Sequence, residues 1–174
     1  MDYDKVLTLL SSLPEPKEWD LENMKRLVEI AGLDLSKLKA VHVTGSNGKG
    51  SVTQTVSTIL VHQGYTVGTY TSPHLVDWRE RIQFNLEKIS QEDFCAIFER
   101  ILPSIEKLRS EGKNVSVFEA NTLIAFTYFI DKGVDFAIVE VGCGGRLDAT
   151  NVLPKPIVSV ITNVSLEHTD KLGR

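Results

Sequence analysis

Hydrophobic and polar residues follow two kinds of pattern along this chain, one typical of amphipathic helices and one typical of buried strands. Apolar residues that recur every three or four positions predict helices at residues 2–11, 20–31, 49–63, 91–110 and 119–132. The fourth helix is expected to be interrupted or bent near Pro103. Apolar runs predict strands at residues 39–45, 65–72, 134–142 and 156–164, and the last two are typical of strands buried on both faces. Residues 71–90 are expected to be irregular.

Strands and helices alternate along most of the chain, which predicts an α/β fold with a mostly parallel sheet flanked by helices. Ligands of such folds bind beyond the carboxyl ends of the strands. Each predicted strand is followed by a motif rich in glycine or polar residues: "TGSNGKGS", "TSPH", "GCGGRLDATN" and "NVSLEH". The four motifs therefore predict one site at one edge of the sheet.

The first motif resembles a phosphate-binding loop but departs from the spelling G-x-x-x-x-G-K-[ST], because Val43 replaces the first glycine and Gly50 replaces the hydroxyl residue. Its glycines allow backbone N–H groups to converge, and a helix beginning near Lys49 adds its positive end. Lys49 is a cation suited to phosphate oxygens, while Asn47 and Ser51 are candidates to cap the helix or to donate to phosphate. The alternative is a plain glycine turn with a capping serine.

Glu140 ends a very apolar strand, where a carboxylate is costly unless it is paired or binds a cation. A metal ion and a salt bridge to Arg146 are both open. Ser72 is a candidate for the hydroxyl that Gly50 lacks, although a Ser-Pro pair is also a common turn. His168 follows the next strand, and by itself it is more typical of a loop histidine than of a metal ligand.

The third motif brings three glycines, Arg146, Asp148 and Asn151 into one loop that suits close approach of a ligand. Cys143 lies among these glycines, but no base is evident beside it, so we do not interpret it as a nucleophile. Cys95 and Cys143 have no metal-ligand spacing, and we expect both to be reduced.

Composition narrows the classes of partner. The net charge of −4 supplies no basic surface for nucleic acid, so an anionic ligand must be held by a local group of residues. The N-terminal residues lack the apolar region of a signal peptide, and no apolar run approaches the roughly 20 residues that span a bilayer. We therefore expect a cytoplasmic protein that binds neither nucleic acid nor membrane.

Taken together, the motifs resemble one family. "HVTGSNGKGSV", "TSPHLVDWRERIQFN", "FEANTLIAF", "EVGCGGRLDATNV" and "NVSLEHTDKLG" occur in the order and spacing of folylpolyglutamate and dihydrofolate synthases, members of the Mur ligase superfamily. The resemblance runs from Leu21 to the last residue. It implies the Mur ligase central domain, in which the lysine of the phosphate loop of folate ligases is followed by glycine and the serine of the "TSP" loop binds magnesium.

Carried onto this sequence, the resemblance implies that ATP phosphates are held by Gly45, Ser46, Asn47, Gly48, Lys49, Gly50 and Ser51. Lys49 would contact the transferred phosphoryl group. Ser72 and Glu140 would bind one Mg²⁺, and Glu140 and His168 would take part in a second metal site. The pterin of the substrate is expected near Thr122, Asp148 and Ala149, and the "TSPHLVDWRERIQFN" segment resembles the family's mobile loop beside the folate and ATP sites.

The implied activity is an ATP-dependent ligase that joins L-glutamate to a carboxylate of folate or dihydropteroate through an acyl phosphate, with ATP and Mg²⁺ as cofactors. We expect a monomer. Because such enzymes run to more than twice this length, we expect residues 1–174 to be a truncated N-terminal ATP-binding domain that lacks the C-terminal glutamate-binding domain and is inactive alone. The alternatives are a short non-catalytic nucleotide-binding module and a Mur-type peptidoglycan ligase, while the acceptor, folate or dihydropteroate, stays open.

Overall fold

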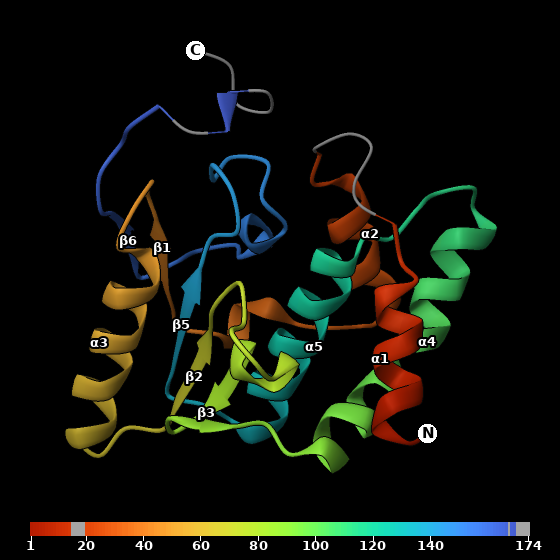
Figure 1. The fold of residues 1–174 in the computed structure, drawn as a ribbon, viewed down its shortest axis with the longest axis horizontal. Helices are drawn as coiled ribbons and strands as arrows, with labels where there is room; N and C mark the ends of the chain where they lie inside the picture. Colours follow the sequence, from red (N-terminus) through yellow and green to blue (C-terminus); the bar gives the residue numbers. More distant parts are fainter. Residues whose placement is uncertain (15–19, 167, 170–174) are drawn as a thin grey trace.

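A six-stranded, mostly parallel sheet forms the centre of the molecule in a computed structural model, which describes residues 1–14, 20–166 and 168–169 (Figure 1). The strands are β1 (Ala40–Thr44), β2 (Val67–Tyr70), β3 (Ile82–Phe84), β4 (Glu87–Lys88), β5 (Phe136–Glu140) and β6 (Val158–Ile161). Their order across the sheet is β4-β3-β2-β5-β1-β6. Strands β2, β5, β1 and β6 run parallel, while β3 and β4 form an antiparallel extension at one edge. The α/β fold predicted from the sequence is confirmed.

Helices cover both faces of this sheet. They are α1 (Tyr3–Ser11), α2 (Glu22–Ile30), α3 (Lys49–His62), α4 (Gln91–Ser110) and α5 (Val117–Lys132), with single 3₁₀ turns at Leu35–Lys37, Trp78–Arg81 and Ala149–Val152. Figure 1 shows α3 on one face and α5 with α1, α2 and α4 on the other. None of the helices in the described ranges has the length and apolar character needed to cross a bilayer.

Local capping explains where several helices begin. Asp2 and Ser90 accept N–H groups of the first turns of α1 and α4, and Ser116 forms a capping box with Glu119 at the start of α5. These contacts satisfy donors that have no partner inside a helix. The start of α3 differs, because Gly48 precedes it in a left-handed conformation and no side chain caps it.

The hydrophobic core has two parts, one on each face of the sheet. The larger part lies between the sheet and α1, α2, α4 and α5, and includes Phe94, Phe98, Phe126 and Phe129. The smaller part joins β1, β2 and β5 to α3. Helix α5 is buried along most of its length between the sheet and the outer helices, so its sequence is apolar on nearly every side.

Three expectations about the fold were wrong. The stretch 71–90 contains two short strands, β3 and β4, of which β3 pairs with the buried strand β2 and β4 pairs with β3. Strand β6 is an edge strand with exposed side chains, although its apolar run predicted burial on both faces. Helix α4 is continuous through Pro103 rather than interrupted.

Candidate functional site

Four loops meet at the carboxyl ends of the parallel strands, as the motifs predicted. The Thr44 hydroxyl donates to the Gly144 carbonyl at 2.6 Å, joining the loops after β1 and β5. The Ser72 N–H donates to Glu140 Oε2 at 3.0 Å, joining the loops after β2 and β5. The Asn47 N–H donates to Asn163 Oδ1 at 3.0 Å, joining the loops after β1 and β6.

The start of α3 forms an anion-binding geometry. Gly48 has φ +82°, which favours glycine, and it turns the chain into the helix at Lys49. Because no side chain caps this helix, its first N–H groups and the positive end of its dipole face the site without a protein acceptor from a cap. The alternative in which Asn47 or Ser51 caps the helix is therefore wrong. The interpretation of the motif as a plain glycine turn with a capping serine is wrong for the same reason.

The preceding half of the loop is held by the segment after β6. The Ser46 N–H donates to the Asn163 carbonyl at 2.9 Å, and Asn163 Nδ2 donates to the Asn47 carbonyl at 3.0 Å. Gly45 has φ +133°, and a Cβ built there would lie 2.1 Å from Thr162 Oγ1. A side chain at position 45 would therefore force the two loops apart.

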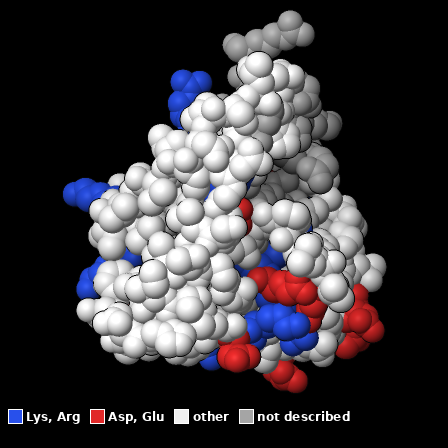
Figure 2. Space-filling view, turned by 60° about the vertical axis from the view of Figure 1, so that its left-hand side comes forward, with Lys and Arg blue, Asp and Glu red and all other residues white. Residues whose placement is uncertain are grey.

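Lys49 folds back over the loop that precedes it. Its ammonium group donates to the Gly45 carbonyl at 2.6 Å and to the Ser46 carbonyl at 3.3 Å. Helix α3 contains no other lysine or arginine and no acidic residue. Figure 2 turns the α3 side of the molecule forward and shows acidic groups with basic groups among them low on this face, and further basic groups along its left edge and near the top. Attraction for an anion therefore comes from Lys49 and the helix end, as the overall charge predicted.

Glu140 lies beside this cation with few partners of its own. Its side chain is 4% exposed, and its recorded hydrogen bond is the Ser72 N–H. Burial raises the pKa of Glu140, while that hydrogen bond and the charge of Lys49 lower it. No ion pair to Glu140 exists within the described residues, and Arg146 is exposed, so the predicted alternative of an Arg146 salt bridge is not observed.

A divalent cation suits the carboxylate of Glu140, which has one recorded hydrogen-bond donor. Mg²⁺ prefers oxygen ligands and is often held by one or two carboxylates together with phosphate oxygens and water. Gly50 leaves room beside the carboxylate, because a Cβ built there would lie 3.6 Å from both Glu140 oxygens. Ser72, a half-buried residue, lies against the same carboxylate through its backbone N–H. Among the described residues no group of three or more His, Cys, Asp or Glu side chains forms a complete metal cluster.

His168 is not brought to Glu140 by a recorded contact. It is exposed on the segment after β6, has φ +46°, and makes no hydrogen bond or ion pair within the described part of the chain. Its predicted metal-binding role therefore stays a prediction.

The residues predicted to lie near the substrate ring have different surroundings. Asp148 is 1% exposed and accepts the Cys143 N–H at 3.0 Å, the Thr150 N–H at 3.0 Å and the Thr150 hydroxyl at 2.5 Å. The Thr150 hydroxyl proton is donated to Asp148, so His42 Nε2 donates to Thr150 Oγ1 at 2.8 Å and extends this buried network. Burial raises the pKa of Asp148.

Thr122 and Ala149 are also buried, whereas Arg146 is exposed. The Thr122 hydroxyl donates to the Phe118 carbonyl at 2.8 Å and lies 3.2 Å from the Tyr70 hydroxyl. Both contacts are made to neighbouring protein groups, so Thr122 is part of the buried layer beneath the site.

Two groups of residues were missed by sequence reasoning. Thr162 and Asn163 shape the phosphate loop, and the polar "NVS" motif after β6 was a signal for them. His74, Trp78 and Arg81 form a second cluster beside Ser72, in a segment that we expected to be irregular.

Comparisons with known proteins agree with this arrangement. The Mur ligase middle domain family matches residues 43–174. The dihydrofolate synthase/folylpolyglutamate synthase of Bacillus subtilis is 41% identical over 155 residues, which are 88% of this chain and 36% of that protein. The crystal structure of folylpolyglutamate synthase from Thermotoga maritima has a TM-score of 0.88 and 46% identity, covering 94% of this chain and 38% of that one.

A solved FPGS complex with AMPPCP and folate has a TM-score of 0.94 and 36% identity, covering all of this chain and 43% of that one. The chain thus spans about two fifths of the length of these relatives. The match covers the sheet, the phosphate loop and the loops that hold Ser72 and Glu140. The chain belongs to the Mur ligase middle-domain family, in its folylpolyglutamate/dihydrofolate synthase branch.

Proposed function

We propose that this chain is the ATP-binding part of a ligase that joins L-glutamate to a carboxylate of folate or dihydropteroate. The observation that carries the proposal is the pairing of an uncapped helix start at Lys49 with the buried carboxylate of Glu140, which has no ion-pair partner in the described residues. The first feature suits phosphate and the second suits its counter-cation. Related structures bound to AMPPCP with folate, and to ADP, support the choice of ligands.

In this proposal the loop from Gly45 to Ser51 surrounds the ATP phosphates. The first N–H groups of α3 donate to phosphate oxygens, and Lys49 exchanges its two carbonyl acceptors for the transferred phosphoryl group. Ser72 and Glu140 hold Mg²⁺, with His168 as a further ligand at a second site. When bound, the metal neutralises negative charge on the phosphates and orients them.

The acceptor lies on the other side of Glu140, with its ring near the loop that follows β5. Arg146 is exposed there and available to a ligand, while Thr122, Asp148 and Ala149 form the buried wall behind it. The acceptor carboxylate attacks the terminal phosphorus of ATP, which gives an acyl phosphate and ADP. The amine of L-glutamate then attacks the activated carbonyl carbon, phosphate leaves, and an amide bond forms.

Because the chain covers about two fifths of its relatives, we propose that ligation needs parts of the protein beyond this chain and that residues 1–174 bind nucleotide without turnover. Calorimetric titration of ATP with Mg²⁺ tests the proposal. We expect binding by the wild type, and at least about 10-fold weaker binding by Lys49→Ala, since one charge-assisted contact contributes about 1.5 kcal/mol or more.

Lys107→Ala is the matched control, because Lys107 is an exposed lysine on α4. Its ATP affinity should equal that of the wild type, and no preparation should turn over folate with glutamate. Equal affinity of wild type and Lys49→Ala would contradict the proposed nucleotide site.

A further inference from the structure

Arg81 lies close to the site without an acidic partner. Its Nε donates to His74 Nδ1 at 2.9 Å, and its guanidinium carbon lies 5.1 Å from the centre of the Trp78 ring. Within the described residues no carboxylate forms an ion pair with it, and no acceptor is recorded for either of its Nη groups. Burial lowers the pKa of Arg81, which means that the surrounding protein disfavours its charged form.

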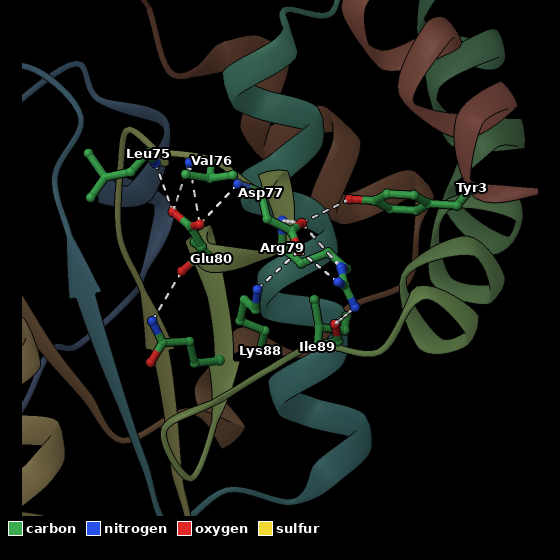
Figure 3. Close-up of polar contacts among 9 residues, drawn as sticks. Tyr3, Leu75, Val76, Asp77, Arg79, Glu80, Lys88 and Ile89 are labelled. Carbon is green, nitrogen blue, oxygen red and sulfur yellow. Dashed lines mark hydrogen bonds and ion pairs between the residues drawn. The ribbon is translucent and has the colours of Figure 1, made fainter.

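Arg79, two residues earlier, differs from Arg81 because its charge is paired within the protein. Its Nη2 and Nε donate to the two Asp77 oxygens at 2.6 and 3.2 Å. Asp77 also pairs with Lys88 at 3.1 Å, and the Tyr3 hydroxyl donates to it (Figure 3). The charge of Arg79 is thus neutralised inside the protein, whereas that of Arg81 is not.

The other nearby carboxylate is also engaged. Glu80 accepts the Leu75 N–H at 2.7 Å and the Asp77 N–H at 2.9 Å, and Figure 3 shows Glu80 under the backbone of this turn. These bonds fix the turn and keep Glu80 away from Arg81. Both acidic groups of the segment therefore leave Arg81 available to an outside anion.

The surroundings of Arg81 hold it in one place beside Ser72. Trp78 Nε1 donates to Asn121 Oδ1 of α5 at 2.7 Å, and the His74 ring stacks on Trp78 with a centroid distance of 5.0 Å. The Thr71 N–H donates to the Arg81 carbonyl at 2.9 Å. Thr71 is followed by Ser72, whose N–H donates to Glu140. Arg81 is therefore hydrogen-bonded to the residue that directly precedes Ser72, a ligand of the proposed metal site.

The donors of this cluster suit an anion with two oxygens. A guanidinium group binds a carboxylate through two parallel N–H groups. The Arg81 Nε–H is used by His74 Nδ1, so the two Nη groups supply the parallel donors and His74 holds the guanidinium in place. The Trp78 ring covers one face of the guanidinium, which leaves its edge for the ligand.

We propose that Arg81, positioned by His74, binds the carboxylate of the acceptor substrate, the group that is phosphorylated, and holds it beside Ser72 and Glu140. The inference rests on the proposed function and adds to it a substrate-binding residue. A carboxylate suits Arg81 because the guanidinium group pairs with a single negative charge on a planar partner. ATP phosphates have their own donors at the start of α3.

Calorimetry with folate and with its uncharged dimethyl ester tests the proposal on the wild type and on Arg81→Gln, Arg81→Lys and Arg79→Gln. We expect Arg81→Gln to bind folate about 10- to 100-fold more weakly, since hydrogen bonds to charged groups have this magnitude. It should bind the ester as the wild type does. Arg81→Lys should lie between, because an ammonium group cannot form two parallel bonds. Arg79→Gln should match the wild type, and all variants should keep their affinity for ATP with Mg²⁺.

The proposal is overturned if the wild type binds folate no better than the ester, or if Arg81→Gln leaves folate affinity unchanged. An equal loss for folate and ester, or an equal loss in Arg79→Gln, would assign Arg81 a structural role instead. A loss of ATP affinity in Arg81→Gln would place Arg81 in the nucleotide site. If ATP binding still depends on Lys49 while folate binding ignores Arg81, this inference fails and the proposed nucleotide function stands.

Discussion

Glu140 and Asp148 lie at the two ends of one glycine-rich loop, and both are buried carboxylates whose pKa is raised by burial. Their partners differ. Asp148 accepts two recorded N–H groups and a hydroxyl, while Glu140 accepts one recorded N–H group. The donors of Asp148 all come from its own loop, from Cys143 and Thr150.

This difference separates a carboxylate that holds a loop together from one that is proposed to bind a cation. Burying a carboxylate is costly, and Asp148 offsets the cost with hydrogen bonds that also fix the loop. Glu140 has one recorded donor, and the charge of Lys49 acts on it from nearby. Both side chains are buried carboxylates, so the number of recorded donors carries the distinction.

The largest expected effect is on stability and concerns Asp148. Asp148→Ala leaves the N–H groups of Cys143 and Thr150 without an acceptor in a buried loop, so we expect the free energy of unfolding to fall by about 3 kcal/mol. Urea denaturation measures this. Asp148→Asn keeps one acceptor oxygen and should lose less. Asp131→Ala, at an exposed ion pair, should change stability by less than about 1 kcal/mol, and an equal loss there would contradict the special role of Asp148.

A smaller effect, on ligand binding, is expected at Glu140. Glu140→Gln keeps the shape of the side chain but removes the charge that would hold Mg²⁺. We expect Mg²⁺ to strengthen ATP binding by the wild type about 10-fold, or about 1.4 kcal/mol, and to have no effect on the variant. Calorimetry with Mg²⁺ and with a chelator gives the two ratios. An unchanged Mg²⁺ dependence would show that Glu140 is not the ligand.

The smallest effect is a pH dependence that Glu140→Gln should remove. Burial raises the pKa of Glu140 above its ordinary value of 4.5, so as pH rises past 4.5 the unfolded chain loses this proton before the folded protein does. The folded state then binds more protons, and its stability falls with rising pH by at most about 1.4 kcal/mol per pH unit. Urea denaturation without metal, from pH 4 upward, should show that the free energy of unfolding of the variant rises relative to that of the wild type. A constant difference would mean that the pKa of Glu140 is not raised.

The phosphate loop and its setting were predictable from sequence because their signals are local. Glycines at 45, 48 and 50, a lysine, and helical periodicity from residue 49 together predict a strand, a turn and a helix, and the structure confirms them. The meeting of Ser72 and Glu140 was also predictable, since neighbouring parallel strands end at the same edge of the sheet.

The features that were missed depend on contacts between distant segments. Strand β3 is recognised by its pairing with β2, because its three residues are too few for their alternation of apolar and polar side chains to predict a strand. Strand β6 has the composition of a central strand, but its place at the edge is set by the order of the whole sheet. Arg79 pairs locally with Asp77, two residues before it, whereas the place of Arg81 beside Thr71 follows from the pairing of β3 with β2.

The hydrogen bonds from Ser46 and Asn47 to Asn163 couple the phosphate loop to the outermost parallel strand of the sheet. Edge strands open more readily than central ones, because they are paired on one side only. Each opening of β6 would release the loop from Asn163 and allow its amides to exchange with solvent. Protection of those two amide protons therefore reports how often the loop loses its shape.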